Sequence, residues 1–278
     1  MNDRELRTAA LSDVVARARS FLFVPGDRPH VVAKAIATDA DVVIVDLEDS
    51  VPPENKSTAR AALDRNAGTE RPTIIRANQI TAAVGQQDLQ ALPRTTVVMV
   101  PKATPESVDA LRRAYPSISA VALIESAEGV AECDYIAAQP NVLRLAFGHL
   151  DLAAELGIDP DDDMALLWAR SRLVYTSARR HLPAPIDGIT ANLTAVGKLG
   201  SDTRRAKRLG YGGKLLIHPS QIAPVHAGFA PTRSELDWAH QVLREAGRGV
   251  SAVDGVMVDE PVLRRAHNIV ASTETGMP

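Results

Sequence analysis

Eight short runs of valine, isoleucine and leucine recur along the chain, and they constrain its fold more than any other feature. Most of the runs are followed by a longer stretch with a helical pattern. The runs lie at residues 21–24, 42–45, 73–76, 97–100, 121–124, 143–146, 186–189 and 215–217. Short continuous apolar runs are typical of strands buried on both faces of a parallel sheet, with helices as the crossovers. Eight such units predict an α/β fold, the TIM (β/α)8 barrel, for which 278 residues are long enough.

The stretches between and after these runs predict the helices and a short C-terminal appendage. Helices are predicted at residues 28–38, 106–115, 164–181 and 203–209, the last ending at Gly210 as its C-cap. A further helix is predicted to begin near Thr232, with a loop or hairpin at 247–258 and a last helix at 261–270. We therefore expect a catalytic barrel over residues 1–230 and a lid and oligomerisation segment over 231–278.

Charge, cysteine content and hydropathy narrow the class of protein. Lys and Arg number 31 against 34 Asp and Glu, so the net charge of -3 offers no basic field for nucleic acid or an anionic membrane. The single cysteine, Cys133, cannot form an internal disulfide and is interpreted as a buried apolar residue in a reducing compartment. No apolar run approaches the roughly 18 residues of a membrane span. We expect a cytoplasmic protein whose partners are small molecules.

Polar residues lie at or just after the C-terminal ends of several apolar runs. The active site of a barrel forms at the C-terminal ends of its strands. The polar residues are Asp46, Glu48, Asp49, Arg76, Asn78, Lys102, Glu125, Asp151 and His218. Carboxylates that converge on one mouth repel each other unless a cation neutralises them, and carboxylate oxygens suit Mg²⁺. A magnesium site is therefore predicted, although each acid taken alone could equally form a salt bridge or a cap at a strand end.

Two other features are assigned no catalytic chemistry. The glycine-rich residues 209–214 precede a strand instead of following one, and no Ser or Thr follows Lys214, so they predict a turn and not a phosphate loop. His218 could be a metal ligand or a base, but no second histidine lies at a helical metal spacing, which favours a hydrogen-bonded structural role.

Several motifs follow one another in a familiar order. They are RSFLFVPG at 19–26, DLEDSV at 46–51, IRAN at 75–78, VPK at 100–102, ALIES at 122–126, FG at 147–148 followed by Asp151, GK at 213–214 and IHPSQI at 217–222. Along nearly its whole length the chain thus resembles the HpcH/HpaI aldolase and citrate lyase β-subunit superfamily of CoA-ester lyases.

The resemblance implies roles for the residues at the mouth of the barrel. Glu125 and Asp151 would be the Mg²⁺ ligands, with Glu125 also facing the substrate, and Arg76 would bind the oxygens of a 2-oxo acid. Glu48 and Asp49 would order waters on the metal with Lys102 beside them. The alternative for these two acids is pairing with Lys102 or Lys56 at the strand ends.

The resemblance also implies a CoA site and an acid supplied by a neighbouring subunit. Pro25, Gly26 and Arg28 would lie where the CoA nucleotide binds, with Lys34 also available to phosphate, although both cations could be surface charges. The segment 255–261 is similar to the one in which related lyases carry an essential acid on a lid, which makes Asp259 the catalytic candidate. Such a lid requires a homo-oligomer, expected to be a trimer or a multiple of it.

The reaction implied is the Mg²⁺-dependent, reversible cleavage of a 3-hydroxyacyl-CoA, such as citryl-, malyl- or citramalyl-CoA, into acetyl-CoA and a 2-oxo acid. A thioesterase acting on malyl-CoA-like esters and a carrier-dependent subunit of a citrate-lyase-type complex remain alternatives. A free aldolase would have no use for the lid acid. Many relatives have Ala-Glu or a similar small-polar pair where this chain has His149-Leu150, so the resemblance leaves open which acyl-CoA is the substrate.

Overall fold

The computed structural model describes residues 3–63, 71–92, 97–195, 197–246, 252–253 and 256–274. By its internal contacts the chain divides into two compact units, Met1–Gly228 and Phe229–Pro278.

The first unit is the predicted TIM barrel. Its strands form one closed, all-parallel sheet in the order of the sequence, from β1 round to β8, which pairs with β1. The strands are β1 (Ser20–Pro25), β2 (Val42–Asp46), β3 (Thr73–Arg76), β4 (Val97–Val100), β5 (Ser119–Ile124), β6 (Val142–Phe147), β7 (Ile186–Asp187) and β8 (Gly213–Leu216). Each coincides with one of the apolar runs.

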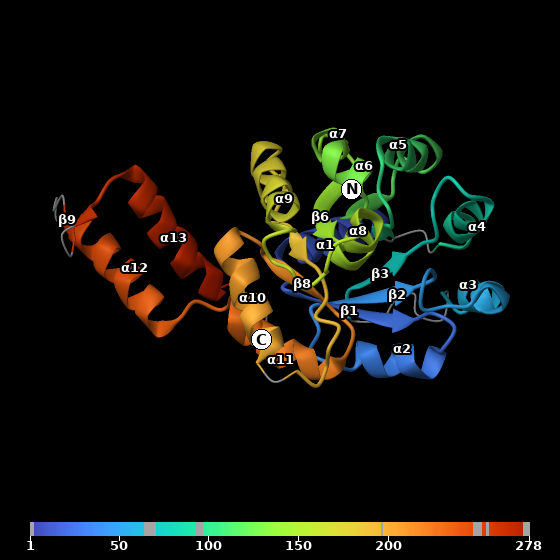
Figure 1. The fold of residues 1–278 in the computed structure, drawn as a ribbon, viewed down its shortest axis with the longest axis horizontal. Coiled ribbons are helices and arrows are strands. Elements are labelled where there is room, and N and C mark those ends of the chain that lie inside the picture. The colour runs from blue at the N-terminus through green and yellow to red at the C-terminus, as the bar shows by residue number, and fades with distance from the viewer. Residues whose placement is uncertain are drawn as a thin grey trace. The chain divides into compact units, whose positions relative to one another are not determined.

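Helices follow the strands and lie outside the sheet, as Figure 1 shows for α2 to α5 around β1 to β3. The helices of this unit are α1 (Asp3–Arg17), α2 (Pro29–Ile36), η1 (Pro53–Asn55), α3 (Lys56–Ala61), α4 (Ala83–Ala91), α5 (Pro105–Ala114), α6 (Ala127–Ala131), α7 (Cys133–Ala137), α8 (His149–Leu156), α9 (Leu167–Arg179), α10 (Lys198–Leu209), η3 (Pro219–Gln221) and α11 (Ile222–Phe229). Helix α10 begins five residues before the predicted start at 203, directly after Gly197, whose left-handed φ of 79° turns the chain into it.

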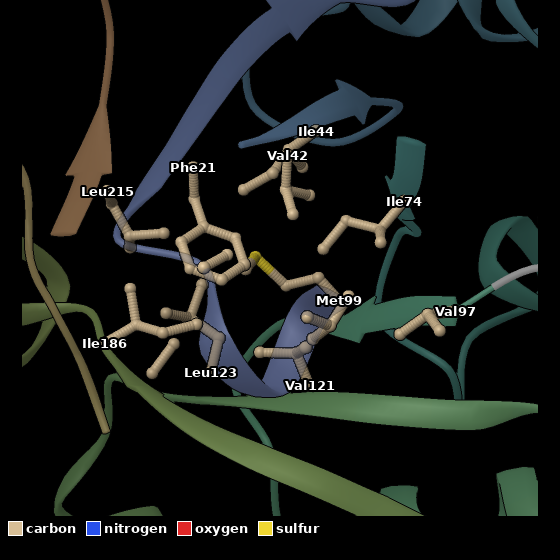
Figure 2. Packing of buried hydrophobic residues seen from close by; sticks show 13 residues of the cluster. Phe21, Val42, Ile44, Ile74, Val97, Met99, Val121, Leu123, Ile186 and Leu215 are labelled. Carbon is tan, nitrogen blue, oxygen red and sulfur yellow. The ribbon is translucent and has the colours of Figure 1, made fainter. Parts of the chain in front are cut away.

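The barrel interior is filled by alternate residues of the strands. Val42 and Ile44 of β2, Ile74 of β3, and Val121 and Leu123 of β5 all belong to one buried cluster, which Figure 2 shows from close by. Successive side chains of a strand point to opposite faces, so the next inward positions are two residues further on. The alternation therefore carries Asp46, Arg76 and Glu125 to the C-terminal mouth of the barrel.

Helix α1 lies against the opposite end of the barrel and was not among the predicted elements. Val15 and Ala18, at and just after its C-terminal end, belong to the same buried cluster. The buried Arg144 of β6 donates from Nη1 to the carbonyls of Val15 and Ala18, at 2.9 and 2.8 Å. Burial lowers the pKa of this arginine to about 9. Arg144 thus closes the last turn of the helix and fixes it to the sheet.

The second unit is a helical pair with a small hairpin. Helices α12 (Arg233–Ala246) and α13 (Glu260–Glu274) pack side by side around the buried Ala239, Val242 and Ala266 (Figure 1). Strands β9 (Ala252–Val253) and β10 (Val256–Met257) pair antiparallel, while residues 247–251, 254 and 255 of the predicted hairpin lie outside the described residues. In the described part of the chain, no helix combines the length and the apolar character that crossing a membrane requires.

Candidate active site

Arg76, at the end of β3, is held by the acids that follow β2. Its Nε and Nη2 donate to the two carboxylate oxygens of Asp46, each at 2.7 Å, in a two-pronged ion pair. Its guanidinium also lies over the ring of Phe23, 4.7 Å from the centroid. Burial opposes the charged form, but the acids around the guanidinium outweigh burial and raise the pKa of Arg76. The arginine is therefore a permanently charged donor fixed in one orientation.

Asp46 was noted at the strand end but given no role, and the structure makes it the anchor of the site. Besides Arg76, its carboxylate accepts hydrogen bonds from the backbone N–H groups of Glu48 and Ser50 at 2.9 and 3.0 Å. It also accepts one from the Ser50 hydroxyl. Although burial alone would raise it, these hydrogen bonds and the Arg76 charge lower the pKa of Asp46. The strand alternation was the signal that could have identified this inward-facing acid.

Glu48 and Asp49 pair with the remaining nitrogen of Arg76. Arg76 Nη1 lies 3.1 Å from Glu48 Oε2 and 3.2 Å from Asp49 Oδ2. Burial, with the charges of Asp49 and Asp46 added, raises the pKa of Glu48 to about 7 despite the nearby Arg76. The predicted alternative of pairing with Lys56 is not what the structure shows, because Lys56 Nζ donates to the carbonyls of Leu47 and Glu48.

Glu125 follows β5 and is buried in the wall of the mouth. Its Oε1 accepts a hydrogen bond of 2.7 Å from the backbone N–H of Lys102, a residue with a left-handed φ of 43°. On the other side it touches Gly148, where any β-carbon would lie 2.5 Å from Glu125 Oε2. Burial first, then the charges of Glu48 and Asp151, raise the pKa of Glu125 to about 8. Lys102 thus contributes its backbone here, while its side chain is exposed.

A cavity of about 310 Å³ opens among these residues. Asp151, an exposed residue in the first turn of α8, lines it together with Arg76 and Glu125. The rest of the wall is formed by Phe23, Asp46, Asp49, Ser50, Leu123, Phe147, Gly148, His149, Leu150, Ile189, Leu215 and Ile217. The structure therefore brings the predicted metal ligands and the predicted substrate arginine into one pocket.

The donor set of this pocket fits a hard divalent cation. Glu125 and Asp151 repel each other across the lining, and Glu48 Oε2 nearby is buried with only its ion pair to Arg76. Among the described residues no group of three or more His, Cys, Asp or Glu is arranged to enclose a metal. Magnesium needs no such enclosure, because it keeps several of its waters and binds through one or two carboxylates.

The three residues predicted to bind the CoA nucleotide lie at the end of β1 and directly after it, outside this cavity's lining. Local structure alone explains the glycine at position 26. Its N–H donates to the Asp46 carbonyl at 2.8 Å, and a β-carbon would collide with the same oxygen. Arg28 is exposed and its Nε lies 3.9 Å from Asp27. Pro25 is the last residue of β1.

The remaining candidates have local hydrogen bonds. His218 precedes η3, and its Nδ1 lies 2.8 Å from the Ser220 hydroxyl, in keeping with a structural role. Cys133 is buried against the Thr176 hydroxyl, and burial raises its pKa. Asp259, in the second unit, accepts a hydrogen bond of 3.1 Å from the N–H of Val262 and so caps the first turn of α13.

A second buried charged cluster lies at β7 and β8, and the sequence analysis did not identify it. Lys214 Nζ lies 3.3 Å from Asp187, and Arg170 Nε lies 3.5 Å from the other oxygen of the same carboxylate. His149 lies close by, and burial together with the Arg170 charge lowers its pKa to about 4, so its ring is neutral near pH 7. Asp187 and Lys214 were missed because neither closes a predicted apolar run: Asp187 lies within the run 186–189, and Lys214 directly precedes the run 215–217.

Comparison with known proteins agrees with this geometry. The family model for HpcH/HpaI aldolase/citrate lyase matches residues 19–219. The chain is 30% identical over 269 residues to a (3S)-malyl-CoA thioesterase of Cereibacter sphaeroides, covering 92% of this chain and 94% of that protein. It is 34% identical over 271 residues to a citrate lyase subunit beta-like protein of Mycobacterium tuberculosis, covering 92% and 95%.

A solved structure extends the likeness to the fold. The CitE protein of Mycobacterium tuberculosis, in complex with magnesium, acetoacetate and coenzyme A, superposes with a TM-score of 0.83 at 32% identity, covering 93% of this chain and 99% of that one. The family match, the relatives and the barrel with its acidic mouth agree, and the chain belongs to the HpcH/HpaI aldolase/citrate lyase family.

Proposed function

We propose that this protein is a Mg²⁺-dependent carbon–carbon lyase that reversibly cleaves a 3-hydroxyacyl-CoA ester into acetyl-CoA and a 2-oxo acid. The observation that carries the proposal is Arg76, buried and held on Asp46, in the same 310 Å³ cavity as Glu125 and Asp151. A fixed guanidinium beside a pair of carboxylates that need a cation suits the oxygens of a small hydroxy or oxo acid.

Glu125 and Asp151 would hold the magnesium ion, and Arg76 would bind the carboxylate of the acid. When bound, the cation supplies Lewis-acid stabilisation of the oxygen that changes from hydroxyl to ketone. Arg76 donates to the same end of the substrate, and its ion pair with Asp46 keeps it from reorienting as charge moves onto oxygen. Glu48 and Asp49 would order water around the ion, and Lys102 would orient Glu125 through its N–H.

Asp259 would exchange the proton of the acetyl methyl group. In cleavage the substrate hydroxyl would lose its proton to solvent, the carbon–carbon bond would break, and the acid form of Asp259 would protonate the acetyl carbon. In condensation its carboxylate would remove that proton, and the new alkoxide would take one from solvent. We propose that it does so from a neighbouring copy of the chain, in a trimer or a multiple of it. Pro25, Gly26 and Arg28 would lie along the CoA nucleotide. The helix cap that Asp259 forms is the competing structural explanation for this residue.

Hydrolysis is the second candidate function, favoured by the likeness to the Cereibacter sphaeroides thioesterase. In that reaction water attacks the thioester carbonyl, the C–S bond breaks, and free CoA leaves with the hydroxy acid intact. The same pocket could hold the hydroxy acid end in both reactions.

The test is to incubate the full-length protein with Mg²⁺ and citryl-, malyl- or citramalyl-CoA and to follow acetyl-CoA, 2-oxo acid and free CoA separately. Acetyl-CoA and a 2-oxo acid in equal amounts, lost on chelation, support the lyase. Free CoA with intact hydroxy acid assigns the thioesterase. Silence with all three esters points to a subunit that needs an acyl-carrier partner.

Two variants separate the roles of Asp259. Asp259→Asn keeps a side-chain oxygen for the helix cap but cannot transfer the proton, whereas Asp259→Ala loses both. Loss of activity in both variants, with the melting temperature kept in Asp259→Asn, supports proton transfer. Full activity of Asp259→Asn, or a fully active monomer, overturns the proposed lid acid.

A further inference from the structure

The wall of the active-site cavity is polar on one side and apolar on the other. The polar side comes from the ends of β2, β3 and β5 and the start of α8, with Asp46, Arg76, Glu125 and Asp151. The apolar side comes mainly from β1, β6 and β8 and the segments after them, with Phe23, Phe147, Leu150, Ile189, Leu215 and Ile217. A 2-oxo acid held on the polar side would turn its third substituent toward the apolar side.

The lining offers no further cationic side chain that could pair with a second carboxylate on the ligand. Asp46, Asp49, Glu125 and Asp151 face a single cationic side chain, Arg76, among the described residues of the lining. The guanidinium already contacts three acids, Glu48 among them. Even with a divalent ion bound, the acids of the lining outnumber the positive charges by one.

Cations do lie nearby, but they line a separate cavity of about 130 Å³ and are matched with acids there. Lys198 Nζ is 3.1 Å from Asp161, and Arg205 Nη1 is 3.1 Å from Asp202. Arg170, 3% exposed, faces Asp187. His149, Leu150 and Ile189 line both cavities, which are therefore adjacent, and each cation named here already faces an acid.

We propose that the 2-oxo acid of this enzyme is a monocarboxylate with an uncharged, apolar substituent, of the pyruvate class, and not a dicarboxylate of the oxaloacetate class. The cleaved ester then carries an alkyl group on its hydroxyl-bearing carbon. The inference rests on the proposed function only in taking a 2-oxo acid as the ligand. Its physical basis is that a second carboxylate would be buried against an apolar wall without a counter-charge.

Binding tests the inference without any turnover. The magnesium-loaded protein is titrated calorimetrically with pyruvate, 2-oxobutyrate and oxaloacetate at equal free Mg²⁺. 2-Oxobutyrate and oxaloacetate have nearly the same length and differ chiefly in the distal methyl or carboxylate. Because an unpaired charge at this wall costs binding energy, 2-oxobutyrate should bind at least about tenfold more tightly than oxaloacetate.

A matched pair of variants locates the effect. Ile217 lines the apolar side and is 37% exposed, so it can accept a longer side chain. Ile217→Lys adds a cation there and should shift the binding ratio toward oxaloacetate by about tenfold. Ile217→Met adds length without charge and should leave the ratio unchanged.

The outcomes separate this inference from the proposed lyase. Tight binding of the monocarboxylates by a protein that cleaves no ester upholds the inference and refutes the lyase. Cleavage of an ester by a wild-type protein that binds oxaloacetate as tightly as 2-oxobutyrate does the reverse. Failure to bind any of the three acids overturns both.

Discussion

Two clusters of buried charge lie in this barrel, and they differ in their balance of acids and bases. At the mouth, three acids, Asp46, Glu48 and Glu125, gather around one buried cation, Arg76. The pKa values of Glu48 and Glu125 are raised to about 7 and 8. At β7 and β8, Asp187 lies between Lys214 and Arg170, and their charges lower its pKa although burial alone would raise it.

The difference distinguishes the candidate site from the other buried cluster. At β7 and β8 the one acid, Asp187, is compensated by two cations, Lys214 and Arg170, so this cluster has no excess of negative charge for a metal ion to neutralise. An excess of acids beside a cavity is stable only with protons or a cation bound there. Burial alone therefore does not mark the candidate site, whereas uncompensated charge does.

The largest expected effect is on stability, in the cluster at β7 and β8. Asp187→Asn leaves Lys214 and Arg170 buried without their counter-charge and should lower the free energy of unfolding by about 3–5 kcal/mol. Chemical denaturation measures this, with Mg²⁺ present or absent. Asp161→Asn, at an exposed pair with Lys198, is the control and should cost less than about 1 kcal/mol. Equal effects of the two changes would contradict the comparison.

At the mouth the corresponding change should affect activity more than folding. Arg76→Lys keeps the charge but loses the two-pronged pair with Asp46 and the planar donor, so kcat/KM should fall by about 10²–10³-fold. Arg60→Lys changes a similar buried pair with Asp88 outside the cavity lining, and its kcat/KM per folded molecule should stay near wild type. A loss in both variants would show that Arg76 acts only through stability.

The pH dependence of stability should have opposite signs in the two clusters. Glu48 and Glu125 have folded pKa values of about 7 and 8 against an ordinary 4.5, so between pH 4.5 and 8 the folded state binds more protons than the unfolded state. Stability of the chelated protein should therefore fall as pH rises through that window. Asp187 has a lowered pKa, so its contribution is present above the ordinary Asp value and is lost as pH falls through its folded value.

Denaturation of the chelated protein at several pH values measures this dependence. Glu125→Gln should flatten the fall between pH 4.5 and 8, and saturating Mg²⁺ should flatten it in wild type. An unchanged slope in Glu125→Gln would show that repulsion at the mouth is not its cause.

The smallest expected effect concerns the backbone beside Glu125. Residue 102 has a left-handed φ of 43°, which glycine adopts without strain, and its N–H donates a hydrogen bond to Glu125. Lys102→Gly keeps this hydrogen bond and should be about 1 kcal/mol more stable than Lys102→Ala. Both should bind Mg²⁺ with the same affinity. A tenfold difference in affinity between them would show that the strained conformation itself matters for the metal.

The sequence predicts the barrel well, because strands buried on both faces must be continuous apolar runs and eight of them leave few alternatives. It also places Arg76, Glu125 and Asp151 at the mouth, since each follows an apolar run. The roles assigned to them stay predictions, as does the lid role of Asp259.

What escaped the sequence analysis depends on direction and on long-range partners. To identify Asp46 as facing the cavity, one must follow the alternation of inward-facing residues along β2 to the end of the strand. Asp187 and Lys214 are charged residues inside buried strands, and nothing local in the chain announces that Arg170 completes their cluster. The charge balance of a pocket becomes visible only when residues distant in sequence are brought together.

The hydrogen bonds between Arg144 and helix α1 constrain the order in which the chain can fold. The two hydrogen bonds from Nη1 join residues separated by 129 and 126 positions. During synthesis the first helix leaves the ribosome long before its binding arginine exists, and it cannot dock until the sixth strand has been made. Helix α1 is thus translated long before β6, yet its contacts with Arg144 form only after β6 has been made.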